Sequence, residues 1–147
     1  LCLGGTKNGM AVGDCVVFFN RELGQEFEYR CKQAGQLASK MRFLSAPWVG
    51  LLTDSVWLRN AQHANAMAQK LATGLKQLGV RIAAPVESNA VFADLTSEQT
   101  TAIRKLGWIF YEFDGIGTPR LMCSWKTTST EIDAFLSDCK RTLLANP

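Results

Sequence analysis

The sequence predicts an α/β fold, and three observations support that prediction. Short apolar runs typical of strands alternate with longer segments whose apolar residues recur every three or four positions, as in amphipathic helices. Capping residues and glycines stand at the ends of these segments. Hydrophobic residues make up 47% of the 147 positions and charged residues 20%, so the chain can bury a core and does not have a disordered composition.

The first part of the chain predicts two short strands and a long helix. Residues 1–3 look like the end of a buried strand, and the run Cys-Val-Val-Phe-Phe at 15–19 suits a strand buried on both faces. From Arg21 onward, one apolar helical face predicts a helix that continues to Met41. Pro47 interrupts the pattern, so a new helical segment is expected to begin there. The residues of the apolar face are Leu23, Phe27, Cys31, Ala34, Ala38 and Met41.

The remainder predicts a small sheet with helices on one face. A helix capped by Asp54 or Ser55 is expected to run to about Gln77, with Gly79 in the position where helices commonly end. Strand, strand, helix, strand, strand, helix then describes a compact α/β sandwich. These elements are expected at 80–82, 90–95, 97–106 with Ser97 as the cap, 108–113, 120–125, and after a capping box of Thr128 and Glu131.

Charge and cysteine content exclude several classes of function. The net charge of +3 is too small, and its lysines and arginines too dispersed, to predict a nucleic-acid partner. The longest apolar runs are too short to span a membrane. Five cysteines form no Cys-x-x-Cys pair and lie in apolar surroundings, which predicts reduced thiols in a cytoplasm and neither disulfides nor a metal site.

The sharpest local motif is the loop Gly4-Gly5-Thr6-Lys7-Asn8-Gly9. Glycines let the backbone approach a ligand, Thr6 adds a hydroxyl donor, and Lys7 adds a primary amine that can act as a nucleophile. A Walker phosphate loop is excluded because Asn8 follows the lysine where Ser or Thr is required. Taken by itself, the pattern also fits a surface turn with a solvated lysine.

The segment from Leu3 to Met10 resembles the cofactor-lysine segment of low-specificity threonine aldolases and phenylserine aldolases. The similarity continues through Val17-Phe18-Phe19, through residues 29–36 (Tyr-Arg-Cys-Lys-Gln-Ala-Gly-Gln) and through 39–44 (Ser-Lys-Met-Arg-Phe-Leu). Near the end, residues 119–125 (Pro-Arg-Leu-Met-Cys-Ser-Trp) match the family's last strand. The resemblance implies the C-terminal part of a fold-type I transferase dependent on pyridoxal 5'-phosphate (PLP). Residues 1–52 would end the large PLP-binding domain, and residues 53–147 would form the small C-terminal α/β domain.

The resemblance also implies roles for single residues. Lys7 would form the Schiff base to the cofactor, and Thr6 would donate to its phosphate. Arg120 matches the family's arginine for the substrate carboxylate, and its planar guanidinium suits bidentate binding. Arg42, with Lys40 on a long helix near the active site and the dimer contact, could reach a phosphate or carboxylate, but it could equally lie on a solvated face. The implied reaction cleaves the Cα–Cβ bond of 3-hydroxy amino acids to glycine and an aldehyde.

Other polar residues are weaker candidates. His63 is the single histidine and could take a proton, but its position in mid-helix favours a structural role. Asn89 could line a site or stand in a turn at a strand edge. The resemblance places the acidic partner of the pyridine nitrogen, the stacking aromatic and the phosphate cradle upstream of Leu1. We therefore expect the 147-residue chain to be inactive alone, with the N-terminal half and a second copy (a dimer or tetramer) as partners.

Two interpretations remain open from the sequence. The first is the lyase, although β-elimination or transamination would use the same lysine and arginine. The second is a non-catalytic α/β interaction module that folds by itself. Exposed apolar residues along 21–41 would argue against the module, because such a face requires a covering partner.

Overall fold

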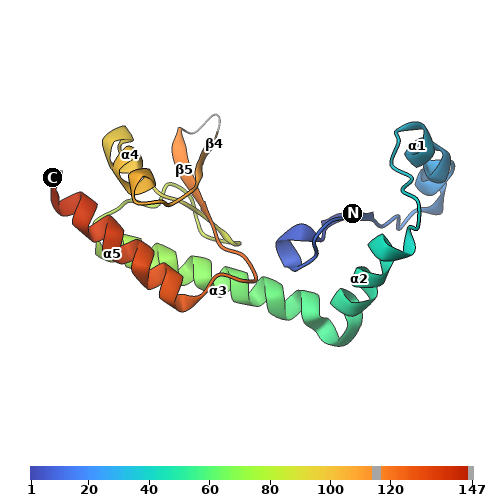
Figure 1. The fold of residues 1–147 in the computed structure, drawn as a ribbon, viewed down its shortest axis with the longest axis horizontal. Coiled ribbons are helices and arrows are strands. Elements are labelled where there is room, and N and C mark those ends of the chain that lie inside the picture. Colours follow the sequence, from blue (N-terminus) through green and yellow to red (C-terminus); the bar gives the residue numbers. More distant parts are fainter. Residues whose placement is uncertain (114–116, 146–147) are drawn as a thin grey trace. The chain divides into compact units, whose positions relative to one another are not determined.

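The computed structural model describes residues 1–113 and 117–145, and these form two compact units (Figure 1). The first unit is Leu1–Arg59 and the second is Asn60–Pro147. The boundary between them falls inside helix α3 (Val56–Gln77), whereas the sequence places the domain boundary between residues 52 and 53. The domain boundary between residues 52 and 53 stays a prediction.

A two-stranded antiparallel sheet begins the first unit. Strand β1 (Cys2–Gly4) pairs with β2 (Asp14–Val16), and Leu3 lies opposite Cys15. The prediction of buried strands at 1–3 and 15–19 is wrong, because Leu1 is 65% exposed and Phe19 is 84% exposed. A sheet of two strands offers few apolar neighbours, and Met10 and Leu51 are the only buried hydrophobic residues among those described in this unit.

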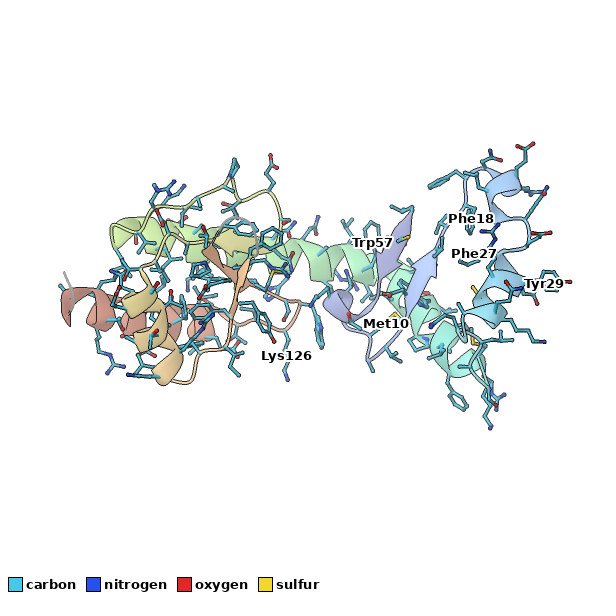
Figure 2. The ribbon with its side chains drawn as sticks, turned by 90° about the horizontal axis from the view of Figure 1, so that it is seen from above. Met10, Phe18, Phe27, Tyr29, Trp57 and Lys126 are labelled. Atoms are coloured by element: carbon cyan, nitrogen blue, oxygen red, sulfur yellow. The ribbon has the colours of Figure 1, made fainter. Side chains whose placement is uncertain are left out.

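The long helix predicted over 21–41 is divided into short pieces. A 3-10 turn, η2 (Arg21–Gly24), precedes helix α1 (Phe27–Gln33), and the backbone leaves the helical region at Glu26 (φ 61°) and Gly35 (φ 68°). Helices this short depend on tertiary packing. Here the predicted apolar face has little to pack on, since Leu23 is 72% exposed. The ring of Phe27 in α1 packs against the ring of Phe18, two residues after β2, with centroids 4.9 Å apart (Figure 2).

Helix α2 (Arg42–Leu52) continues through Pro47, so the expectation that a helical segment begins at this proline is wrong. A proline removes one N–H donor, but the bonds on either side of it are kept. The N–H of Ser45 donates to the Met41 carbonyl at 3.0 Å, and the N–H of Thr53 donates to the Val49 carbonyl at the end of the helix. A short 3-10 turn, η3 (Thr53–Ser55), then leads into α3.

The second unit contains a three-stranded antiparallel sheet in the order β3-β5-β4. Its strands are β3 (Ala90–Phe92), β4 (Tyr111–Phe113) and β5 (Thr118–Met122). The strand expected at 80–82 is reduced to one bridge, between Ile82 and Ala93. Residues 114–116, between β4 and β5, lie outside the described residues.

Three helices bury one face of this sheet, as the sequence predicts. They are α3, α4 (Ser97–Lys105) and α5 (Ser129–Ala145). Val91 and Leu121 turn from the sheet toward the helices, and Leu75 and Ile103 meet them from α3 and α4. Each such side chain contributes about 1.5–3 kcal/mol by leaving water. The core is completed by Ala68, Leu71, Ala72, Val80, Ala93, Leu95, Phe110, Cys123, Ile132, Phe135 and Cys139.

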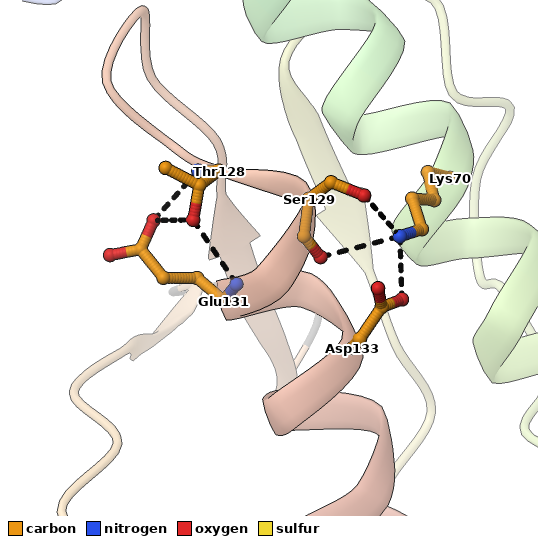
Figure 3. Close-up of polar contacts among 5 residues, drawn as sticks. All are labelled: Lys70, Thr128, Ser129, Glu131 and Asp133. Atoms are coloured by element: carbon orange, nitrogen blue, oxygen red, sulfur yellow. Dashed lines mark hydrogen bonds and ion pairs between the residues drawn. The ribbon is translucent and has the colours of Figure 1, made fainter.

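Local capping fixes where the last two helices begin. The cap of α4 is Thr96 and not Ser97 as predicted: its hydroxyl accepts from the Gln99 N–H, and the Gln99 side chain accepts from the Thr96 N–H. The capping box predicted for α5 is confirmed, with Glu131 Oε2 accepting from the Thr128 N–H at 2.7 Å (Figure 3). Beside it, Lys70 of α3 binds Asp133 and Ser129 of α5.

Candidate functional site

The lysine loop folds into a 3-10 turn, η1 (Thr6–Asn8), organised around Gly5. The Gly5 N–H donates to the Gly13 carbonyl at 3.0 Å. The Gly5 carbonyl accepts from the N–H groups of Asn8 and Met10, at 3.0 and 3.1 Å. These backbone bonds hold the turn without help from a large core.

Glycine is required at the centre of this turn. A Cβ on Gly5 would lie 2.5 Å from Met10 Sδ and 3.0 Å from the Gly13 carbonyl oxygen, and both distances are shorter than normal contacts. Gly9, just after the turn, has φ 108°, which strongly favours glycine. The glycines noted in the sequence therefore shape the loop that presents Lys7.

Asn8 connects the turn to the start of α3. Its Nδ2 donates to the Trp57 carbonyl at 2.9 Å. From the sequence, Asn8 indicates only that the loop is not a Walker phosphate loop. No local pattern predicts its bond to a residue 49 positions away. The structure thus gives this asparagine a positioning role that the sequence does not reveal.

Thr6 and Lys7 lie side by side on the turn, and both are exposed. The turn therefore presents an accessible primary amine next to an accessible hydroxyl. A ligand that carries an aldehyde and a phosphate requires an amine for covalent attachment and neutral or cationic donors for its anionic end. The chemistry of these two side chains fits pyridoxal phosphate.

Arg42 occurs in the same unit but is not joined to the turn. It is the first residue of α2, and its Cζ lies 4.9 Å from the centroid of the neighbouring Phe43 ring. Lys40, expected on the same helix, instead precedes α2 with φ 59°. Among the described residues no hydrogen bond or ion pair links Arg42 to Thr6 or Lys7, so its role stays a prediction.

Arg120 belongs to the second unit, at the middle of the central strand β5. It is half-buried, and it lies opposite Phe92 of β3 and Tyr111 of β4. Its Cζ stands 5.8 Å from the centroid of the Phe113 ring. The side chain thus emerges from the sheet face that the helices do not cover.

His63 and Asn89 both make structural hydrogen bonds. His63 Nε2 donates to the Thr127 carbonyl at 2.7 Å, which ties α3 to the segment before α5. Asn89 Nδ2 donates to the Cys123 carbonyl at 2.7 Å, and its own carbonyl accepts from the Cys123 N–H at 2.9 Å. Asn89 therefore extends the pairing of β3 with β5, in line with its interpretation as a residue at the strand edge.

A pocket of about 390 Å³ in the second unit contains none of the predicted site residues. Apolar side chains such as Leu71 and Phe135 line it, with Lys126 and Glu131 among its polar residues. Within the part of the chain that is described, no cluster of three or more His, Cys, Asp or Glu side chains could hold a metal ion. Nor does any helix there combine the length and apolar character needed to cross a membrane.

Residues 1–98 match the model of the family described as beta-eliminating lyase, and the chain belongs to that family. Within it, the chain is 53% identical over 146 residues to a low-specificity L-threonine aldolase of a Pseudomonas species, covering 99% of this chain and 42% of the relative. It is 54% identical over 141 residues to the low-specificity L-threonine aldolase of Pseudomonas aeruginosa, covering 95% and 41%. The chain therefore spans less than half the length of these relatives.

A solved structure of the threonine aldolase of Leishmania major has the same fold. It superposes with a TM-score of 0.80 at 31% identity, covering 95% of this chain and 42% of that one. The family and the fold class predicted from the sequence, part of a fold-type I PLP-dependent enzyme, are thereby confirmed.

Proposed function

We propose that this chain carries the cofactor lysine and the substrate-carboxylate arginine of a PLP-dependent aldehyde-lyase. The reaction would cleave the Cα–Cβ bond of 3-hydroxy amino acids of the threonine or phenylserine type, giving glycine and an aldehyde. The observation that carries the proposal is an accessible Lys7 on a turn fixed by backbone bonds, in a chain 53% identical to a low-specificity L-threonine aldolase.

In this proposal each residue has a separate task. Lys7 Nζ attaches the cofactor, the Thr6 hydroxyl donates to its phosphate, and Arg42 is a further candidate for an anionic group. Bound pyridoxal phosphate supplies an electron sink for the pair released when the Cα–Cβ bond breaks. Arg120 binds the substrate carboxylate and so fixes which bond of the substrate is oriented for cleavage.

The alternative of a free-standing interaction module is opposed by the exposed apolar surface of the first unit. Along the segment predicted to need a partner, Leu23 is 72% exposed, Leu37 50% and Met41 43%. Tyr29 of α1 also points away from the protein and is 70% exposed (Figure 2). A surface of this kind requires a cover, and we propose that the remaining part of a longer protein and a second copy in a dimer or tetramer supply it.

We also propose a cytoplasmic location, supported by five free cysteines. The substrate is a small amino acid, and no nucleic-acid or membrane partner is proposed. The isolated chain of 147 residues is expected to lack activity, because it spans only 42% of its Pseudomonas relative.

Borohydride trapping with pyridoxal phosphate tests the proposal. It is applied to this chain and to a chimera in which the chain replaces the aligned segment of the Pseudomonas relative, and peptide mapping locates the adduct. We expect an adduct at Lys7 and release of glycine and acetaldehyde from L-threonine by the chimera. Both are expected to disappear in Lys7→Arg but not in Lys32→Arg, which changes another exposed lysine of the same unit.

Two results would contradict the proposal. An absence of selective labelling at Lys7 in the chimera would remove the cofactor assignment. Release of ammonia and an oxo acid in place of glycine and aldehyde would favour β-elimination by the same residues. Equal labelling of Lys7 in the chain and in the chimera would instead refute the expectation that the turn needs a longer protein to bind the cofactor.

A further inference from the structure

One face of the sheet in the second unit remains open and carries aromatic side chains around Arg120. Val91 and Leu121 turn toward the helices, so the alternate residues of β3, β4 and β5 share the opposite face. We call this the open sheet face, and its large side chains are Phe92, Tyr111, Phe113, Arg120 and Met122. Tyr111 is 77% exposed, Phe113 42% and Met122 40%.

Phe113 holds the guanidinium of Arg120 from the neighbouring strand. It lies diagonally across from Arg120, because its direct partner on β5 is Thr118. The 5.8 Å between Arg120 Cζ and the Phe113 centroid is within the range of a cation–π interaction. Phe92 packs edge-on against the same ring, with centroids 5.7 Å apart and planes at 77°, and so limits its movement.

The donors of Arg120 are left available by this arrangement. Among the described residues, Arg120 makes no ion pair or hydrogen bond through its side chain, whereas Arg104 pairs with Glu112 and Arg81 pairs with Asp94. A ring contacts the flat face of a guanidinium, while a carboxylate binds along its N–H edge. An arginine held by an aromatic ring alone is therefore oriented and still free to bind a carboxylate with two hydrogen bonds.

We infer that Phe113 is a positioning residue that orients the guanidinium of Arg120 for the substrate carboxylate. This inference rests on the proposed function, which gives Arg120 that ligand. Orientation before binding limits the side-chain freedom that would otherwise be lost when the carboxylate binds. Phe113 therefore raises the affinity for the substrate without touching it.

Steady-state kinetics of the chimera with L-threonine test the inference. In Phe113→Leu, which keeps an apolar side chain but removes the ring, we expect KM to rise about three- to tenfold while kcat changes less than about twofold. Phe113→Tyr restores the ring and is expected to restore KM. Tyr111→Leu is the matched control: it removes an exposed ring that is directly opposite Arg120 but makes no ring contact with it, and KM should not change.

The variant Arg120→Lys separates the inference from the proposed function. If this variant raises KM and Phe113→Leu does not, the inference is overturned and the proposed function stands. If Arg120→Lys leaves KM unchanged, the role of Arg120 fails and the inference fails with it. A Phe113→Tyr variant that behaves like Phe113→Leu would also overturn the inference, because the aromatic ring would then not be the cause.

A spectroscopic measurement on the chain provides a readout independent of catalysis. In the native chain, the ring current of Phe113 is expected to shift the Nε–Hε proton signal of Arg120 away from that of an exposed arginine such as Arg21. The shift should disappear in Phe113→Leu and persist in Tyr111→Leu. An Arg120 signal that is the same in the native chain and in Phe113→Leu would refute the contact.

Discussion

Gly74 of α3 lies against Leu136 of α5, and an alanine there tests how tightly the second unit is packed. A Cβ on Gly74 would lie 2.2 Å from Leu136 Cδ1, 2.8 Å from Cδ2 and 3.1 Å from Cγ. Leu136 packs against the buried core of this unit, so its side chain cannot move away without disturbing other contacts. The substitution Gly74→Ala therefore overpacks the interface.

Two opposing effects set the magnitude. Overpacking lowers the free energy of unfolding by about 1–3 kcal/mol, and the higher helix propensity of alanine raises it by about 1 kcal/mol. We expect Gly74→Ala to lower the free energy of unfolding by about 1 kcal/mol. In a Leu136→Ala background all three close atoms are gone, so the same change should raise the free energy of unfolding by about 1 kcal/mol.

Urea denaturation of the four proteins of this double-mutant cycle measures the coupling between Gly74 and Leu136. Amide hydrogen exchange, resolved for each helix, adds a control at Gly50 of α2, where an added Cβ meets nothing within 4 Å. There Gly50→Ala should stabilise α2 by about 1 kcal/mol. A Gly74→Ala effect that is the same with and without the Leu136 side chain would show that α3 and α5 do not approach as closely as this geometry requires.

Two further predictions concern titratable groups of the second unit. The indole N–H of Trp108 and then the guanidinium of Arg141 hold the pKa of Asp138 below its ordinary 3.8. A lowered carboxyl pKa stabilises the fold above that ordinary value, and the stabilisation is lost as the pH falls through the folded pKa. In urea melts between about pH 5 and pH 2, the free energy of unfolding should fall less steeply with pH in Asp138→Asn than in the native chain. An equally steep fall in both would show that Asp138 is not its source. Burial raises the pKa of Cys123 to about 11 and of Cys139 to about 12. Iodoacetamide at about pH 8 should therefore alkylate the exposed Cys2 and spare both until urea is added, and equal rates would contradict their burial.

The second unit could be predicted well because its signals are local and its core is present in the chain. The capping box of Thr128 and Glu131 lies within four consecutive residues, and it forms as expected. The apolar residues of α3 have partners within the chain, since Leu71 and Leu75 lie in one cluster with Val91 and Leu121. The error at Ser97, with Thr96 as the actual cap, is a displacement by one residue between two chemically similar caps.

Prediction failed in the first unit because helical periodicity assumes a surface to pack against. The face from Leu23 to Met41 has the spacing of a helix, but spacing stabilises a helix only when the face is covered. With Leu23 and Met41 exposed, packing does not hold one continuous helix, and the backbone turns to positive φ at Glu26 and Gly35. The same absence of cover explains why the strand predicted at 15–19 is shorter and more exposed than expected.

In the candidate site, too, the features set by neighbouring residues could be predicted and those set by distant residues could not. The turn that presents Lys7 is encoded within a few residues, since the bonds of Gly5 and the exclusion of a side chain there involve only Asn8, Met10 and Gly13. The sequence therefore predicts this turn from local residues alone, and the role of Lys7 stays a prediction.

The surroundings of Arg120 depend instead on strand register. A shift of one residue in the pairing of β4 with β5 would turn Phe113 to the other face and separate it from the guanidinium. Register is set by the core residues on the covered face, Val91 and Leu121 among them, and no local motif specifies it. Core substitutions that loosen the register should therefore affect the contact between Arg120 and Phe113 before they affect the turn at Lys7.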